Sequence, residues 1–245
     1  MRSLSLFWIR SLKNIRNGGG LRDYSFDVDF LVHPLSSVLT RAGNTRVLSS
    51  VSLSDTVPPH VVSGGWLTAE YALLPASTST RFKRERSGVS GRTAEIQRII
   101  GRSLRMSVDM QAFSGYTMTV DCDVLDADGG TRTTSINGGM LAVAIACKRM
   151  QERGIVEKSP LKGWIGAISG GVIEGEIVID LDYERDSRAE SDFNFVFDEN
   201  GRIIEIQGTA EHKPLDEKVF LELLAESRSC VLQLIKKMKT VAGLQ

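Results

Sequence analysis

The sequence has few of the residues that build common catalytic and metal sites. Only three cysteines and three histidines occur among 245 residues. The cysteines (Cys122, Cys147 and Cys230) are widely spaced and odd in number, so they fit neither a disulfide framework nor a zinc site. We therefore expect buried thiols in a reducing compartment, taken as the cytoplasm. The histidines share no spacing, and we assign them no catalytic role.

A long apolar run and a net charge are also absent. No apolar stretch is long enough to span a membrane, so we expect no membrane partner. The net charge is zero, which by itself argues against a nucleic-acid partner, but the charges are unevenly distributed. Residues 81–105 hold eight Lys or Arg against two acids, and residues 176–192 hold seven acids against two Arg. Such a chain can bind a polyanion at the first segment and a cation at the second.

The pattern along the chain predicts a two-part α+β protein. Residues 1–20 are basic, contain no acid and end in three glycines, so we predict an atypical, poorly ordered segment; an organellar transit peptide is the alternative. The polar connection Gln151–Lys162 separates a first half, 21–150, from a second, 160–245. Alternating or apolar runs predict strands at 24–30, 38–41, 46–53, 66–74, 118–124, 164–173, 176–181, 193–197 and 202–207. A long helix is expected at 216–240.

A glycine pair follows one of these strands and precedes an apolar helix. Gly129-Gly130 ends the strand, and Met140–Met150 reads as a buried helix. Residues 130–132, Gly-Thr-Arg, thus feed a helix N-terminus, where free N–H groups and the helix dipole favour an anion. Arg132 adds a guanidinium that can hold phosphate through two hydrogen bonds. The alternative, of about equal weight on these residues alone, is a tight turn with a solvated arginine.

A similar turn opens a second helix. Apolar residues at three- and four-residue spacing from Ile96 to Val108 predict an amphipathic helix, and residues 90–93, Ser-Gly-Arg-Thr, lie at its start. Two Gly/Arg/Thr turns at two helix starts could hold one anion. The polar, basic loop 77–91 precedes this helix; a charge run is usually a solvated face, so its value depends on what it faces.

Three aspartates in the acidic segment are the second chemical signal. Asp180, Asp186 and Asp192 are spaced by six, near strand ends and the loop between them. Carboxylate oxygens suit Mg²⁺, which usually takes one or two protein carboxylates and keeps waters for substrate phosphate. A solvated acidic loop is the simpler alternative, and without other context the stronger one.

Six segments, taken together and in order, resemble ribonuclease PH. The two longest are Ser90–Arg105, SGRTAEIQRIIGRSLR, and Asp121–Ile136, DCDVLDADGGTRTTSI, which is similar to that family's phosphate loop. The others are GWLTAEY at 65–71, DLDYERDS at 180–187, AESDFN at 189–194 and EIQGTAE at 205–211. The resemblance implies the ribonuclease PH fold (ribosomal protein S5 domain 2-like), with two mixed sheets and helices packed against them.

The resemblance also implies an activity and a set of site residues. It implies a 3′→5′ exoribonuclease that uses inorganic phosphate as co-substrate, trims precursor tRNA and other structured RNA with a single-stranded 3′ end, takes part in rRNA processing and forms a homo-hexamer. Phosphate binding falls to Arg92, Gly130, Thr131 and Arg132. Catalysis falls to Asp180 and Asp186, and the Mg²⁺ cofactor to Asp186 and Asp192. RNA binding falls to Arg81, Arg84 and Arg86.

The chain departs from the family in two places. Residues 1–20 lack the Arg-x-Asp-Gly-Arg element with which the family usually begins, and Ala76 stands where an arginine is expected. Two other classes therefore stay open: a catalytically silent RNA-binding ring subunit, and a metal-dependent hydrolytic nuclease. Dependence of the products on phosphate separates all three.

Overall fold

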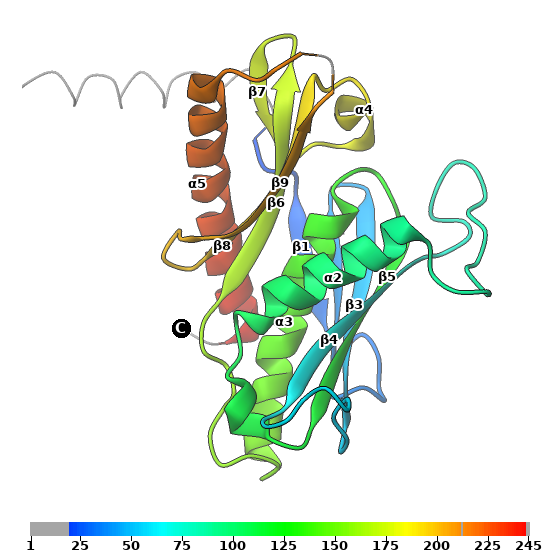
Figure 1. The fold of residues 1–245 in the computed structure, drawn as a ribbon, viewed down its shortest axis with the longest axis vertical. Coiled ribbons are helices and arrows are strands. Elements are labelled where there is room, and N and C mark those ends of the chain that lie inside the picture. Colours follow the sequence, from blue (N-terminus) through cyan, green and yellow to red (C-terminus); the bar gives the residue numbers. More distant parts are fainter. Residues whose placement is uncertain (1–19, 212, 244–245) are drawn as a thin grey trace, which may run out of the picture.

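The computed structural model describes residues 20–211 and 213–243, which form two β-sheets and the helices between and beside them (Figure 1). The predicted α+β class is confirmed. The prediction of poor order for residues 1–20 falls, except for Gly20, outside the described residues.

The first sheet contains five strands: β1 (Tyr24–Val28), β2 (Ser36–Ala42), β3 (Thr45–Ser54), β4 (Trp66–Leu73) and β5 (Thr117–Asp126). Their order is β1-β2-β3-β5-β4, and only the β4–β5 pair is parallel. The strands predicted at 38–41 and 46–53 form a hairpin: β2 and β3 pair from Ala42 opposite Thr45, across a turn with Gly43 at φ 57°. On β5, the even-numbered residues from Met118 to Val124 face the core.

The first half of the chain also forms two helices that pack on this sheet. Helix α2 (Gly91–Arg105) packs on β4, and helix α3 (Thr131–Glu152) packs on β2, β3 and β5. A short 3₁₀ turn, Met110–Phe113, precedes β5. Helix α3 is apolar or small on every side because it lies between the two sheets and is buried along most of its length.

The second sheet contains β6 (Ile165–Ile173), β7 (Glu176–Ile179), β8 (Ser191–Asp198) and β9 (Ile203–Ala210), in the order β7-β6-β8-β9. Every pair in it is antiparallel, so the expectation of two mixed sheets is right for the first sheet and wrong for the second. The short helix α4 (Tyr183–Asp186) lies between β7 and β8. Helix α5 (Glu217–Ala242) covers one face of this sheet, with Phe220 against Phe193 and Phe195.

The two halves share one hydrophobic core, with α3 at its centre (Figure 1). The side chain of Asn137 on α3 crosses between them: it donates to the Ala167 carbonyl at 2.9 Å and accepts from the Ala167 N–H at 2.8 Å. This core also buries the thiols of Cys122 and Cys147, as predicted, and their burial raises the pKa of each to about 12. None of the described helices is both long and apolar enough to cross a membrane.

Candidate active site

The loop that joins β5 to α3 has an open helix N-terminus. Gly129 and Gly130 have φ values of 73° and 63°, in the left-handed region that glycine enters without strain. Gly130 is the N-cap of α3 and supplies no side chain to cap it, and the first turn of α3 contains no acid. The unpaired N–H groups of this turn are therefore available to an anion, as the sequence predicts.

Neighbouring side chains fix the first turn of α3. The Thr133 hydroxyl donates to the Gly130 carbonyl at 3.0 Å, and Ser135 donates to the Thr131 carbonyl at 2.8 Å. The hydroxyls of Thr131 and Tyr71 lie 2.9 Å apart. Thr131 and Arg132 are half-buried, so the loop holds the predicted anion-binding residues on a rigid support.

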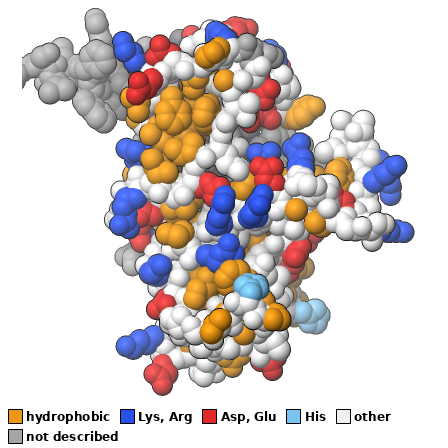
Figure 2. Space-filling view, viewed as in Figure 1, with side chains coloured by type: hydrophobic (Ala, Val, Ile, Leu, Met, Phe, Trp, Pro, Cys, Tyr) orange, Lys and Arg blue, Asp and Glu red, His pale blue; other side chains and the backbone are white. Residues whose placement is uncertain are grey.

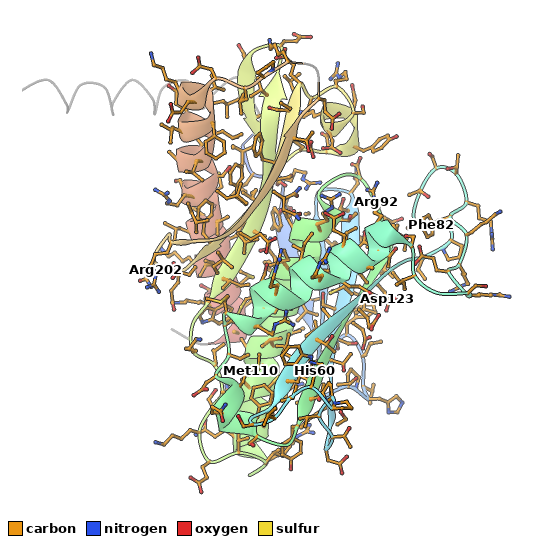
Figure 3. The ribbon with its side chains drawn as sticks, in the orientation of Figure 1. His60, Phe82, Arg92, Met110, Asp123 and Arg202 are labelled. Atoms are coloured by element: carbon orange, nitrogen blue, oxygen red, sulfur yellow. The ribbon has the colours of Figure 1, made fainter. Side chains whose placement is uncertain are left out.

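Arg92 reaches the same region from another element. Ser90 caps α2 by accepting a hydrogen bond from the Thr93 N–H at 3.2 Å, and this places exposed Arg92 in the first turn (Figure 3). Arg92 and Arg132 both act electrostatically on the Tyr71 hydroxyl and on Asp186. The charges of the two Gly/Arg/Thr turns therefore act on the same two groups, which the sequence left open.

Asp186, in the second half of the chain, lies near enough to both arginines to be affected by their charges, and Asp192 lies close to Asp186. Asp186 ends α4, and Asp192 lies near the start of β8. Partial desolvation and the nearby charge of Asp192 raise the pKa of Asp186, while Arg132 and Arg92 act in the opposite direction. Two carboxylates that repel each other beside an anion-binding turn fit Mg²⁺, which needs only one or two protein carboxylates. Among the described residues, no group of three or more His, Cys, Asp or Glu is placed to hold a metal.

The structure does not support the catalytic role predicted for Asp180. Its side chain is 0% exposed, and both of its oxygens accept hydrogen bonds from the segment before β1 and from β1 itself. The partners are Arg22, through Nη2 at 2.7 Å and the backbone N–H at 3.0 Å, and the Tyr24 hydroxyl at 3.2 Å. A carboxylate occupied in this way has no open face for substrate or metal.

The basic segment divides into two parts. Arg81, Arg84 and Arg86 are exposed on a loop that projects from the body, with Phe82 at the same loop (Figures 1 and 3), and within the described residues they form no ion pair. On α2, by contrast, Arg102 pairs with Glu205 and Arg105 stacks on Trp66 at 4.7 Å. Lys and Arg side chains gather over α2 and on the projecting loop (Figure 2), but some of those on α2 serve internal contacts.

Sequence reasoning missed Arg22 as part of the site's support. Its guanidinium donates to Asp180 and also to the Asp128 carbonyl at 3.0 Å. Burial acts to lower the pKa of Arg22, but the hydrogen bond and charge of Asp180 outweigh it and the pKa is raised. The only signal in the sequence was its position at the start of the ribonuclease PH-like region.

The glycine loop gives a first testable prediction. A Cβ on Gly129 would lie 2.5 Å from the Asp182 carbonyl carbon, which is backbone and cannot move aside. We expect Gly129→Ala to cost about 1–3 kcal/mol of unfolding free energy and to weaken phosphate binding, measured by urea unfolding and titration calorimetry.

Gly154→Ala is the matched control. Gly154 has a similar φ of 69° but no atom within 4 Å of its added Cβ, so the control carries the backbone strain without the clash. Equal losses in the two variants would contradict the close packing of the loop against 181–183.

Comparison with known proteins identifies the family. Models of the 3′ exoribonuclease family match twice, domain 1 at residues 20–148 and domain 2 at 163–230. The chain belongs to the 3′ exoribonuclease family. Within it, the chain is 46% identical to a ribonuclease PH of Bacillus velezensis over 228 residues (91% of this chain, 93% of the relative). It is 48% identical to a ribonuclease PH of Syntrophomonas wolfei over 218 residues (87% and 91%).

These relatives confirm the resemblance to ribonuclease PH and the expected enzyme class, a phosphate-dependent exoribonuclease. Solved structures confirm the fold. Rice Rrp46 matches with a TM-score of 0.75 at 19% identity, covering 94% of this chain and 99% of that one. An Archaeoglobus fulgidus exosome with RNA bound to the active site matches with a TM-score of 0.79 at 20% identity, covering 95% and 96%.

Proposed function

We propose that this enzyme trims the 3′ end of precursor tRNA by phosphorolysis at the cluster of Arg92, Arg132, Asp186 and Asp192. The observation that carries the proposal is that two arginines from two helix starts act on Asp186, which has a second carboxylate, Asp192, beside it. The arginines supply a place for an anionic nucleophile, and the carboxylates supply proton transfer and metal binding beside it.

The chemistry requires these charges. The attacking phosphate and the scissile phosphodiester are both anionic, so their repulsion must be offset before they meet. The N–H groups of the α3 turn, with Arg92 and Arg132, neutralise and orient the phosphate. Its oxygen bonds to the scissile phosphorus while the bond from phosphorus to the 3′ oxygen breaks. The products are a nucleoside diphosphate and an RNA shorter by one nucleotide, whose 3′ oxygen takes a proton.

Asp186 is suited to provide that proton when no cation is bound to it, because desolvation and the nearby charge of Asp192 raise its pKa. Asp186 and Asp192 would hold Mg²⁺, which supplies positive charge to the scissile group and the leaving oxygen. Most of the catalytic effect is then positioning and electrostatics, which explains why no nucleophilic serine or cysteine is needed.

Product analysis tests the proposal. A tRNA with a short 3′ extension is incubated with the enzyme and Mg²⁺, with and without inorganic phosphate. Nucleoside diphosphates that appear only with phosphate are the expected result. Monophosphates formed regardless of phosphate would identify a hydrolytic nuclease, and bound RNA with no product would identify a silent ring subunit.

The projecting loop is the proposed entry for RNA. Arg81, Arg84 and Arg86 are exposed, unpaired within the described part of the chain and carried on one loop, so they can follow an RNA backbone. Replacing all three with alanine should weaken RNA binding and lower the slope of log K against log salt by about 2, since each single-strand phosphate contact contributes about 0.7. An unchanged slope, measured by fluorescence anisotropy from low to moderate salt, would remove the loop from the RNA path.

The proposed assembly is a homo-hexamer in the cytoplasm. The exosome structures are similar to this chain in fold alone, so they do not determine its assembly. Support for the hexamer comes from the similarity to ribonuclease PH. The three cysteines, all free, suit a reducing compartment. Sedimentation velocity on the full chain measures the assembly, and a stable monomer at micromolar concentration would contradict it.

A further inference from the structure

We propose that Arg22 and Asp180 are a positioning pair that sets the phosphate loop at a fixed place relative to the turn carrying Asp186. This inference rests on the proposed function and deepens it: it gives Asp180 a task in phosphate affinity and none in metal binding or proton transfer. Three sets of contacts support this role, one at each end of the pair and one between the segments that the pair joins.

At the first end, Arg22 and Asp180 form an almost fully buried ion pair. Their side chains are 10% and 0% exposed, and Arg22 Nη2 lies 2.7 Å from Asp180 Oδ1. The second carboxylate oxygen accepts from the Arg22 backbone N–H at 3.0 Å. Two contacts from one residue to both oxygens fix the orientation of the carboxylate as well as its position.

At the other end, the same guanidinium holds the phosphate loop. Arg22 Nη1 donates to the Asp128 carbonyl at 3.0 Å and lies 3.4 Å from the Gly129 carbonyl. A planar guanidinium can bond the carboxylate with one nitrogen and the loop carbonyl with another, which an ammonium on a flexible stem does less well. The hydroxyl of Thr45 also holds the loop, accepting from the Asp128 N–H and donating to the Gly129 carbonyl.

Between these ends, the phosphate loop packs directly on the segment that leads into α4. An added Cβ on Gly129 would lie 2.6 Å from the Leu181 carbonyl and 2.7 Å from the Tyr183 nitrogen, and one on Gly130 would lie 2.6 Å from Arg22 Nη2. Asp182 caps α4 within this segment and Asp186 ends it. A shift of Arg22 therefore changes the distance between the anion-binding turn and Asp186.

The backbone at Asp180 adds a further sign that its position matters. Asp180 has φ 62°, in the left-handed region that residues with a Cβ seldom adopt, and it is fully buried. Its N–H donates to the Ser169 carbonyl at 2.7 Å, and the next N–H donates to the Ser169 hydroxyl at 3.1 Å. The unfavourable backbone conformation at Asp180 orients its carboxylate toward Arg22.

The test separates phosphate affinity from metal binding in the full-length enzyme. Arg22→Lys and Asp180→Asn are compared with the wild type for kcat, for KM of phosphate and of RNA, and for the rise in melting temperature that Mg²⁺ produces. We expect KM for phosphate to rise about ten- to a hundred-fold in both variants, as misplacement of the loop by a fraction of an ångström implies. KM for RNA and the Mg²⁺-induced rise should stay near wild type.

A metal-binding role for Asp180 makes the opposite prediction. Asp180→Asn would then lose the Mg²⁺-induced rise in melting temperature, and high Mg²⁺ would restore its activity with KM for phosphate unchanged. That result would overturn the proposal. Wild-type enzyme that forms no diphosphates would instead overturn the proposed function, so the two failures are distinguishable.

A double variant guards against loss of folding. Removing one partner of a buried ion pair leaves the other charge uncompensated, whereas replacing both with apolar residues of similar size is often tolerated. Arg22→Met with Asp180→Asn removes both charges, and asparagine tolerates the left-handed backbone at position 180. This variant is therefore expected to fold, to keep its response to Mg²⁺ and to show the raised KM for phosphate. A folded double variant with wild-type phosphate affinity would show that the pair serves stability alone.

Discussion

Arg132→Ala is expected to fold as the wild type does and to lose about 10²–10³-fold in kcat for phosphate-dependent trimming, the usual effect of removing one preorganised charge donor. Among the described residues Arg132 forms no ion pair, and the first turn of α3 is fixed by Thr131 and Thr133, so the substitution removes charge without removing structure. Initial rates over a range of phosphate concentrations measure the effect.

Arg153→Ala is the matched control for this prediction. Arg153 is exposed at the other end of the same helix α3, far along the chain from the phosphate loop. It should change neither kcat nor KM for phosphate, and melting curves of both variants should overlay that of the wild type. Near-normal turnover of Arg132→Ala at saturating phosphate would contradict the place assigned to Arg132.

The fold was predictable where local pattern and packing agree. The hairpin of β2 and β3 follows from a Gly-containing turn between apolar runs, and the core face of β5 follows from strict alternation. The glycine pair indicated where α3 begins, although its first turn, Thr-Arg-Thr-Thr-Ser, has no apolar period of its own. Helix α4, four residues long, is too short to leave a periodic signal.

The sequence indicated which residue types form the site, but it did not indicate how deeply each is buried or what each contacts. Asp180 and Asp186 have the same chemistry and regular spacing, yet one is buried under Arg22 and the other ends an exposed turn. The contact between Arg22 and Asp180 joins residues 158 positions apart, which no local pattern encodes. Likewise, the sequence does not reveal that two arginines of the basic segment make internal contacts. Arg102 forms an ion pair with Glu205, and Arg105 stacks on Trp66.

Asp186→Asn is expected to lose about 10²–10⁴-fold in kcat, the range associated with a positioned acid or base, while RNA binding persists because the basic loop is untouched. The same substitution should raise the melting temperature at neutral pH. The raised pKa means that the ionised carboxyl is disfavoured in the folded state by desolvation and by Asp192. The penalty is full above the folded pKa and disappears below the unfolded value of about 3.9.

Three measurements then have linked signs. The stability gain of Asp186→Asn should shrink as pH falls from 7 toward 4, because the wild-type carboxyl becomes protonated in both states. Mg²⁺ should raise the wild-type melting temperature and raise that of the variant less, because a cation that binds the folded state relieves the repulsion that the substitution has already removed. Glu184→Gln on the same turn, at an exposed residue that pairs with Arg188, should show none of these effects. A variant that is less stable than the wild type at pH 7 without metal would mean that Asp186 is held by a favourable contact, and the repulsive carboxylate pair proposed here would be wrong.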